Sequence, residues 1–163
     1  MFEPTYIKDL DRQYTDLCVG LNTIKDTTDK LIPFFLSQTR YAHLTYEELY
    51  QMISPSVRTQ QYHIWQDSTG ITGFANWAFL NPAVLDKYLS TGRLGTLDWQ
   101  SGKMMCWIEV ISTKDMPQMM SWMKNYSVNL LGENVRLYWL RSDQDHIRTV
   151  MKIRTKRSWR WAV

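Results

Sequence analysis

Residues 73–112 read GFANWAFLNPAVLDKYLSTGRLGTLDWQSGKMMCWIEVIS, and this stretch decides the fold. Two apolar runs, at 71–79 and 104–111, are rich in β-branched and aromatic residues and predict strands. Between them, the segment 82–90 opens with a proline, as helices often do, and the loop DWQSG follows at 98–102. The second run contains one acid, Glu109. The pattern therefore predicts strand, helix and strand, with a lone carboxylate on the second strand.

Similar signals extend toward the N-terminus. Apolar residues at helical spacing predict an amphipathic helix over about 5–30, namely Tyr6, Leu10, Tyr14, Leu17, Leu21 and Ile24. The polar run 26–29 predicts a break, with a second segment from Leu31. Thr45 and Glu48 have the spacing of a capping box, so a helix should begin there and end near Ile53, before Pro55.

The remaining elements complete a mixed fold. A strand over 60–66, a turn at 67–70 and the strand at 71–79 predict a hairpin. A Met-rich helix over 116–129 and two strands near 135–141 and 147–154 follow. The sequence thus predicts an α+β fold in which helices flank a mostly antiparallel central sheet.

Composition narrows the class of protein. The chain has 163 residues, which predicts one domain, and a net charge of +3 that is concentrated in its last residues. It has no secretory leader and no apolar run of 18 residues, so we expect a cytoplasmic protein without an integral membrane segment. Two cysteines and three histidines without ligand spacing predict no metal site.

Several residues of the central stretch fall on a known pattern: Gly73, Trp77, Ala78, Asp98, Trp99, Ser101 and Gly102. In this order they resemble the toxin-activating lysine acyltransferases, which attach fatty acyl chains to lysines of RTX protoxins. The resemblance covers about residues 37–155 and implies a GNAT-like acyltransferase fold. Residues 1–30 would then be an additional N-terminal helical extension, and 156–163 a basic tail.

The resemblance also implies candidate catalytic residues. The family uses a His from a Ser-x-x-His-Arg motif and an Asp on the apolar strand, where this chain has Glu109. An ungapped alignment puts Tyr41 at the position of the His, and His43 lies two residues later. On a helix those two positions differ by about 200°, but an irregular segment could bring His43 into place. His43 is therefore the candidate base, Tyr41 the alternative, and Glu109 the partner carboxylate.

Other residues have roles in binding or in structure. Trp77 and Trp107 are candidates for an acyl slot, although aromatic residues also pack cores. Asp98, Ser101 and Gly102 are expected to organise a tight loop. By alternation, Glu109 should share the face of Trp107 and Ile111, whereas His63 should lie on a wetter face opposite Tyr62 and Ile64.

We expect a protein-lysine acyltransferase without a permanently bound cofactor, which takes its acyl group from acyl carrier protein. The chain lacks the Gly-rich turn that seats a pyrophosphate, which favours that donor over a CoA thioester. The acceptor would be an RTX-type toxin or other secreted peptide, and family relatives suggest a possible homodimer. The alternative is a non-catalytic family member acting as a binding subunit in toxin or microcin maturation. Nucleic-acid binding through the basic aromatic tail lacks any supporting motif, and we expect none.

Overall fold

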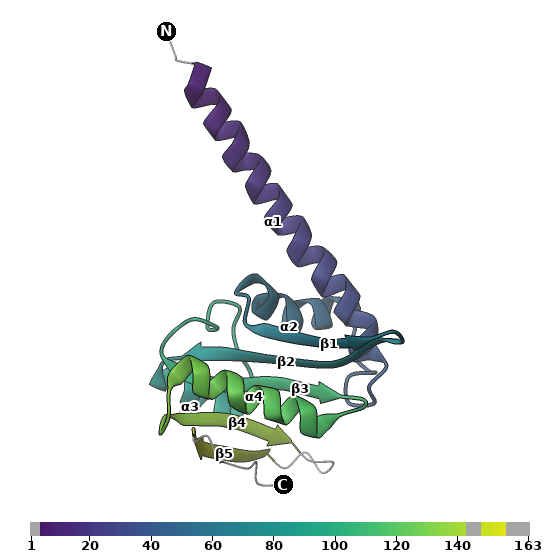
Figure 1. The fold of residues 1–163 in the computed structure, drawn as a ribbon, viewed down its shortest axis with the longest axis vertical. Coiled ribbons are helices and arrows are strands. Elements are labelled where there is room, and N and C mark those ends of the chain that lie inside the picture. The colour runs from purple at the N-terminus through teal and green to yellow at the C-terminus, as the bar shows by residue number, and fades with distance from the viewer. Residues whose placement is uncertain (1–3, 143–147, 156–163) are drawn as a thin grey trace. The chain divides into compact units, whose positions relative to one another are not determined.

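The computed structural model describes residues 4–142 and 148–155 and divides the chain into two compact units, Met1–Arg58 and Thr59–Val163 (Figure 1). The predicted basic tail and His146 lie outside the described residues. Within the described residues, no helix combines the length and the apolar character needed to cross a bilayer.

The first unit consists of helices α1 (Pro4–Leu36) and α2 (Tyr46–Arg58), which pack on each other. The predicted break at 26–29 is wrong, because polar side chains there support the helix. Lys25 Nζ pairs with Asp29 Oδ2 at 2.6 Å, and Thr28 Oγ1 donates to the Ile24 carbonyl at 2.7 Å. The C-terminal part of α1 supplies fully buried side chains, including those of Leu31 and Phe35.

Helix α2 begins at the predicted capping box. The Glu48 amide donates to Thr45 Oγ1 at 3.2 Å, and Glu48 Oε2 accepts from the Thr45 amide at 2.7 Å. The helix does not end before Pro55 as predicted, but continues to Arg58 with Pro55 buried inside it. A proline removes one amide from the helix, and burial of Ile53 and Val57 on either side of it stabilises the extra turn.

The second unit is one five-stranded sheet with helices on both faces. Its strands are β1 (Tyr62–Asp67), β2 (Gly70–Leu80), β3 (Met104–Ser112), β4 (Arg136–Ser142) and β5 (Arg148–Arg154), and they lie in chain order. Neighbouring strands are antiparallel except β3 and β4, which are parallel. A parallel pair needs a crossover, which α4 (Met116–Leu131) supplies. This arrangement confirms the predicted α+β class.

Two apolar clusters lie on the opposite faces of this sheet. Helix α4 covers one face, where Met123 packs with Trp77, Trp107 and Leu137 (Figure 1). Helix α3 (Pro82–Thr91) covers the other face. The residues of that second cluster alternate along the strands with those of the first, namely Ala78, Leu80, Cys106, Tyr138 and Leu140. The face covered by α4 is called the α4 face below, and the other the α3 face.

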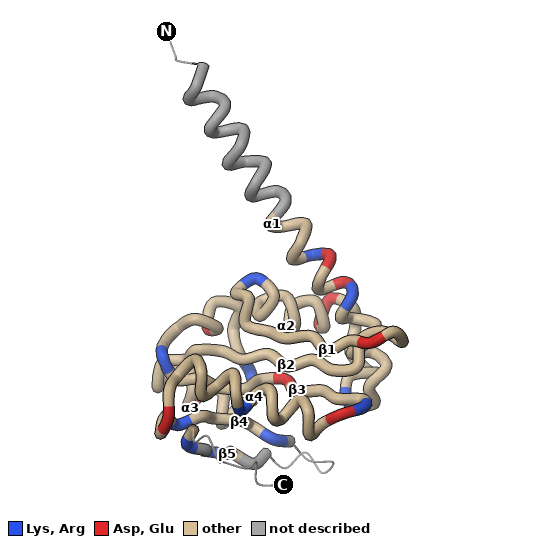
Figure 2. The backbone as a smooth tube through the Cα atoms, viewed as in Figure 1, with Lys and Arg blue, Asp and Glu red and all other residues tan. Residues whose placement is uncertain are grey.

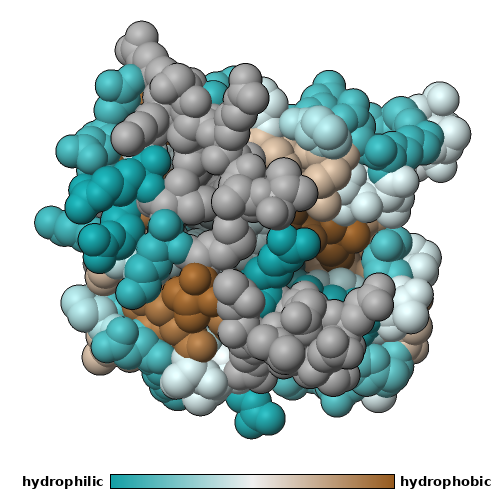
Figure 3. Space-filling view, turned by 90° about the horizontal axis from the view of Figure 1, so that it is seen from below, coloured by the Kyte–Doolittle hydropathy of each residue, from teal (hydrophilic) through white to brown (hydrophobic). Residues whose placement is uncertain are grey.

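The described surface is mainly hydrophilic in the view of Figure 3, with small apolar areas between polar ones. Large apolar side chains that remain exposed are scattered, and the most exposed is Leu97. Isolated apolar residues of this kind are normal on a protein surface. The polar groups set into the sheet are therefore the candidates for a functional site.

Candidate active site

A bulge interrupts β3 at its single acid. Trp107 pairs with Trp77 and Val110 pairs with Ala75, so Ile108 and Glu109 together oppose the single residue Asn76. An extra residue of this kind bends a strand, and such bulges are frequent beside active sites. The carboxylate thus lies at the one irregular point of an otherwise regular, apolar pair of strands.

The bulge decides which face Glu109 occupies. Trp107 and Val110 both face α4, because their partners Trp77 and Ala75 are two residues apart on β2. Glu109, next to Val110, therefore lies on the α3 face with Ile111. The prediction that Trp107, Glu109 and Ile111 share a face is wrong, because the extra residue breaks the alternation on which it depended.

Asn76 holds the bulge in place. Its side chain is fully buried, and its Oδ1 accepts a hydrogen bond of 2.8 Å from the Glu109 amide. A strand bulge leaves the ladder locally disrupted, and here a side chain replaces the missing backbone partner. The Glu109 side chain is half-buried. Asn76 is a residue that sequence reasoning missed, and a polar residue inside the apolar run 71–79 was the available signal.

The parallel ladder between β3 and β4 ends next to this point. The parallel ladder between β3 and β4 consists of two pairs, Cys106 with Tyr138 and Trp107 with Trp139. Within the described part of β4, this ladder contains no pair beyond Trp107 and Trp139. Glu109 therefore lies just past the end of the parallel ladder.

His43 and Tyr41 belong to the first unit, in the turns between α1 and α2. Successive i to i+3 hydrogen bonds run through residues 35–44, so the segment is irregular and the 200° separation expected on a helix does not apply. His43 is exposed. The pKa of the nearby Glu48 is lowered chiefly by hydrogen bonds from the amide and the hydroxyl of Thr45, and His43 adds a smaller contribution. Tyr41 is 5% exposed and packs edge-on against Phe35. Because Glu109 is in the second unit, its convergence with His43 stays a prediction.

His63 differs from its prediction. It lies opposite Tyr62 and Ile64 as expected, but that side is the α4 face and not a wet surface. Its ring stacks on Trp122, with centroids 4.0 Å apart, and meets Trp65 edge-on at 4.5 Å. Burial lowers the pKa of His63, so the imidazole is neutral at neutral pH. The sheet separates it from Glu109, so these two residues cannot form a dyad.

Trp77 and Trp107 lie in the core between the sheet and α4. Their rings meet at 5.2 Å, and both side chains are almost completely buried. The Trp107 Nε1–H is buried without a hydrogen-bond partner among the described residues. Their predicted role in an acyl slot stays a prediction.

The DWQSG loop closes on the end of β2. Asp98 Oδ2 accepts from the Gly95 amide at 2.7 Å, and Ser101 Oγ accepts from the Asn81 amide at 3.1 Å. The Gly102 amide donates to the Phe79 carbonyl at 3.0 Å. Asp98, Ser101 and Gly102 thus organise the loop, as predicted.

The buried side chain of Gln61 ties this loop to the strand. Its Nε2 donates to the carbonyls of Trp77 and Trp99, at 2.9 and 3.0 Å. The loop therefore lies beside the part of β2 that extends past the end of the β1–β2 pairing. This connection fixes the strand that carries Asn76.

Cys106 lies on β3 close to the bulge, but its thiol is inaccessible. The side chain is fully buried, and desolvation raises its pKa to about 12. Only a thiolate is a good nucleophile, so Cys106 cannot serve as one at neutral pH. The described residues also contain no group of three or more His, Cys, Asp or Glu placed to hold a metal ion.

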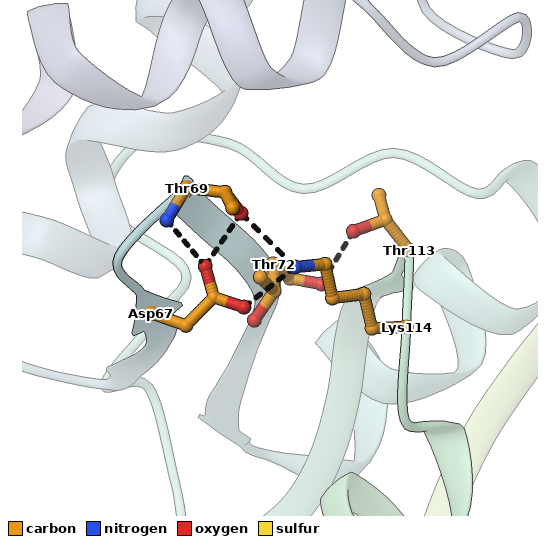
Figure 4. A network of polar contacts seen from close by, with 5 residues as sticks. All are labelled: Asp67, Thr69, Thr72, Thr113 and Lys114. Carbon is orange, nitrogen blue, oxygen red and sulfur yellow. Dashed lines mark hydrogen bonds and ion pairs between the residues drawn. The ribbon is translucent and has the colours of Figure 1, made fainter.

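A polar network ties the β1–β2 turn to the loop that precedes α4 (Figure 4). Lys114 Nζ bonds Asp67 Oδ2 at 2.6 Å and Thr69 Oγ1 at 3.0 Å. The bond from Lys114 first, and then the hydrogen bonds that the Thr69 hydroxyl and amide donate to Asp67 Oδ1, hold the pKa of Asp67 well below its usual range. A pocket of about 440 Å³ adjoins the network, and its lining includes Trp65, Lys114 and Asp115.

Asp115 occupies the start of α4. Its Oδ1 accepts from the Gln118 amide at 2.9 Å, as an N-cap residue does. A helix N-terminus is otherwise a favourable position for an anion. Here the Asp115 carboxylate already occupies the helix N-terminus, so its negative charge would repel a phosphate group.

No curated protein matches the chain. The model of the RTX toxin acyltransferase family matches residues 30–154, well over half of the chain, and includes both Glu109 and His43. This family consists of acyltransferases that act on toxins. The chain therefore belongs to the RTX toxin acyltransferase family.

Proposed function

We propose that the protein moves a fatty acyl group from acyl carrier protein to an internal lysine of a partner toxin or other secreted protein, in the cytoplasm. The observation that supports the proposal is the position of Glu109 on β3, the strand on which the resemblance to the family implies a catalytic acid. The bulge and Asn76 hold this carboxylate on the α3 face, just past the end of the β3–β4 ladder.

The reaction is aminolysis of a thioester. The lysine Nζ attacks the carbonyl carbon, the C–N bond forms, and the C–S bond to the carrier breaks. A lysine with a pKa near 10 is mostly protonated at neutral pH, so it first loses one proton to solvent and attacks as the neutral amine. In the proposal His43 accepts the second proton as the C–N bond forms and passes it to the departing thiolate, while Glu109 orients the imidazole and stabilises its positive charge.

The acyl group passes directly from donor to acceptor. A two-step route would need a nucleophile that holds the acyl group in between. Cys106 is excluded from that role by its complete burial and by its raised pKa of about 12.

Two charge features support a carrier protein as the donor. The N-terminus of α4, where a CoA pyrophosphate would be expected, is capped by Asp115. In addition, exposed Arg136, Lys152 and Arg154 lie on the α3 face with Tyr138. Arg136 is two residues before Tyr138 on β4, and β5 pairs Arg154 with Arg136 and Lys152 with Tyr138. Figure 2 shows Lys and Arg positions along both strands. Acyl carrier protein is strongly acidic, and complementary charge accelerates such encounters.

The test is intact-mass spectrometry of a candidate acceptor protein co-expressed with the chain. We expect a fatty-acyl mass gain that His43→Ala and Glu109→Gln abolish and that His63→Phe, on the other face, retains. A gain that survives Glu109→Gln would refute the catalytic role of this carboxylate. Stable binding without any mass gain would instead favour a non-catalytic subunit, an alternative consistent with Glu in place of the family's Asp.

The donor is tested separately with purified components. Acylated carrier protein and acyl-CoA are offered in turn, and acceptor mass is followed over time. The double variant Arg136→Glu, Arg154→Glu should slow transfer from the carrier, with a smaller effect at high salt. Equal use of acyl-CoA would contradict the proposed donor and leave the acyltransfer itself in place.

A further inference from the structure

The pocket of about 440 Å³ at the end of the sheet, where β3 leads into α4, has no part in the proposed acyl transfer. Its lining comes from β1, β2, β3, the loop 113–115 and α4, all within the second unit. The volume falls within the range of about 300–1,000 Å³ that is usual for small-ligand sites. Trp65 and Met119 place the pocket on the α4 face, so the sheet separates it from Glu109.

Part of the lining is apolar. Trp65 is half-buried, and its indole meets the rings of His63 and Trp122 edge-on, with centroids 4.5 and 5.2 Å apart. Met119 is 2% exposed and reaches the sheet at Gly73, where an added Cβ atom would lie 2.6 Å from its Sδ. The missing side chain at Gly73 thus gives Met119 its place. An alkyl chain in the pocket would contact Trp65 and Met119.

The charged groups of the lining leave one negative charge. Lys114 Nζ bonds Asp67 Oδ2 and Thr69 Oγ1, so the charges of Lys114 and Asp67 balance (Figure 4). Asp115 Oδ1 accepts from the Gln118 amide, and Asp115 Oδ2 has no hydrogen-bond partner among the described residues. The N-terminus of α4 carries about half a positive charge, which the full charge of the Asp115 carboxylate exceeds. The pocket therefore favours a cation and repels an anion.

Uncharged oxygen atoms are also available in the lining. The side chains of Gln66, Thr72, Ser112 and Gln118 make no hydrogen bond to another described residue. Each has an oxygen that can accept a hydrogen bond, and a protonated primary amine has three donors and no acceptor. An aromatic face also attracts a cation within about 6 Å of the ring centroid, which Trp65 can supply. The lining thus matches an ammonium group better than a neutral or an anionic one.

We propose that this pocket binds a protonated primary amine on an alkyl stem, the group that a lysine side chain or a free polyamine presents. The stem contacts Trp65 and Met119, and the ammonium donates to Asp115 Oδ2 and to neighbouring side-chain oxygens. A carboxylate beside the amine keeps it charged, whereas an acceptor lysine must be neutral to attack a thioester. The bound amine is therefore held and not acylated, and the site is independent of the proposed acyl transfer.

The first experiment titrates the full chain, labelled with ¹⁵N in its tryptophans, with Nα-acetyl-lysine methylamide and follows the indole N–H resonances by NMR. Trp65→Phe identifies the resonance of Trp65 among the eight tryptophans. We expect this resonance to shift with a dissociation constant on the order of 1 mM, as for a ligand of this size, while that of the buried Trp107 stays in place.

The charge of the probe is the matched control. The Nε-acetylated form has the same stem without the ammonium and should leave the Trp65 resonance in place. Equal shifts with the two forms, or no shift with about 20 mM of the charged probe, would overturn the proposal.

The same titration with 1,5-diaminopentane separates the two sources of the amine. Tighter binding of the diamine would support the site and assign it to a free polyamine. Tighter binding of the lysine probe would support the site and assign it to a protein side chain.

The last experiment removes the charge of the pocket. Asp115→Asn keeps the helix cap, because asparagine caps a helix about as well as aspartate does. Asp86→Asn removes the same charge from an exposed position on α3, over the other face of the sheet. We expect the dissociation constant of the lysine probe to rise about tenfold in Asp115→Asn and to stay within about twofold in Asp86→Asn. Equal effects of these two substitutions would overturn the proposed ammonium site.

Discussion

Replacing Gly102 by alanine should strongly destabilise the second unit. A Cβ atom there would lie 2.4 Å from the Asn81 backbone nitrogen and 2.5 Å from the Leu80 carbonyl carbon. Favourable contacts between such atoms are about 3.5 Å long, so the overlap is about 1 Å. Both neighbours are backbone atoms and cannot rotate away. The loop must therefore move off the end of β2.

That movement removes two hydrogen bonds, from Gly102 to Phe79 and from Asn81 to Ser101. Overpacking costs about 1–3 kcal/mol and each lost bond about 1 kcal/mol, so we expect a loss of about 3–5 kcal/mol in unfolding free energy. For a chain of this size the melting temperature should fall by roughly 10 °C.

Thermal unfolding followed by tryptophan fluorescence measures the change, with Gly73→Ala as the matched control. There the added Cβ would lie 2.6 Å from Met119 Sδ, the end of a flexible side chain that can move. Gly73→Ala should lower the melting temperature by only a few degrees. If Gly102→Ala lowers it no more than Gly73→Ala does, the reasoning from the backbone contact is refuted.

Three further predictions concern the site and its surroundings. Glu109→Gln should lower the rate of acceptor acylation roughly a hundredfold, whereas Glu109→Asp should retain it, as initial rates of mass gain will show. Cys106→Ala should leave that rate within about twofold, and a large loss would point to a covalent step through the thiol. Because burial lowers the pKa of His63, the unfolded chain binds that proton more readily, and stability falls as the pH drops below about 6.5. In His63→Phe this loss should be absent, which melting temperatures of both proteins between about pH 7 and 5 will test.

Most elements could be predicted because their signals are local. The capping box of α2 and the closing of the DWQSG loop each depend on residues within a few positions of one another. The two wrong helix boundaries have a different origin. Pro55 and the polar run 26–29 each disfavour a helix when taken alone. In α2 the burial of Ile53 and Val57 outweighs the effect of Pro55, and in α1 the Lys25–Asp29 pair outweighs that of the polar run.

The surroundings of the site could not be predicted in the same way. Alternation put Glu109 on the face of Trp107, since nothing in the run 104–111 marks an extra residue. His63 was expected on a wet face, because the alternation of β1 shows two faces but not which of them a later helix, α4, covers. Both errors concern tertiary contacts between segments far apart in the chain.

The bulge at Ile108 and Glu109 has a consequence for the faces of β3. A regular ladder that kept Trp107 opposite Trp77 would set Glu109 opposite Ala75 and turn it toward α4, among tryptophan rings in place of the α3 face. The same sequence without the bulge would thus withdraw the acid from the face on which Asn76 holds it. In this strand the single extra residue opposite Asn76, as much as the identity of the acid, determines where the carboxylate is presented.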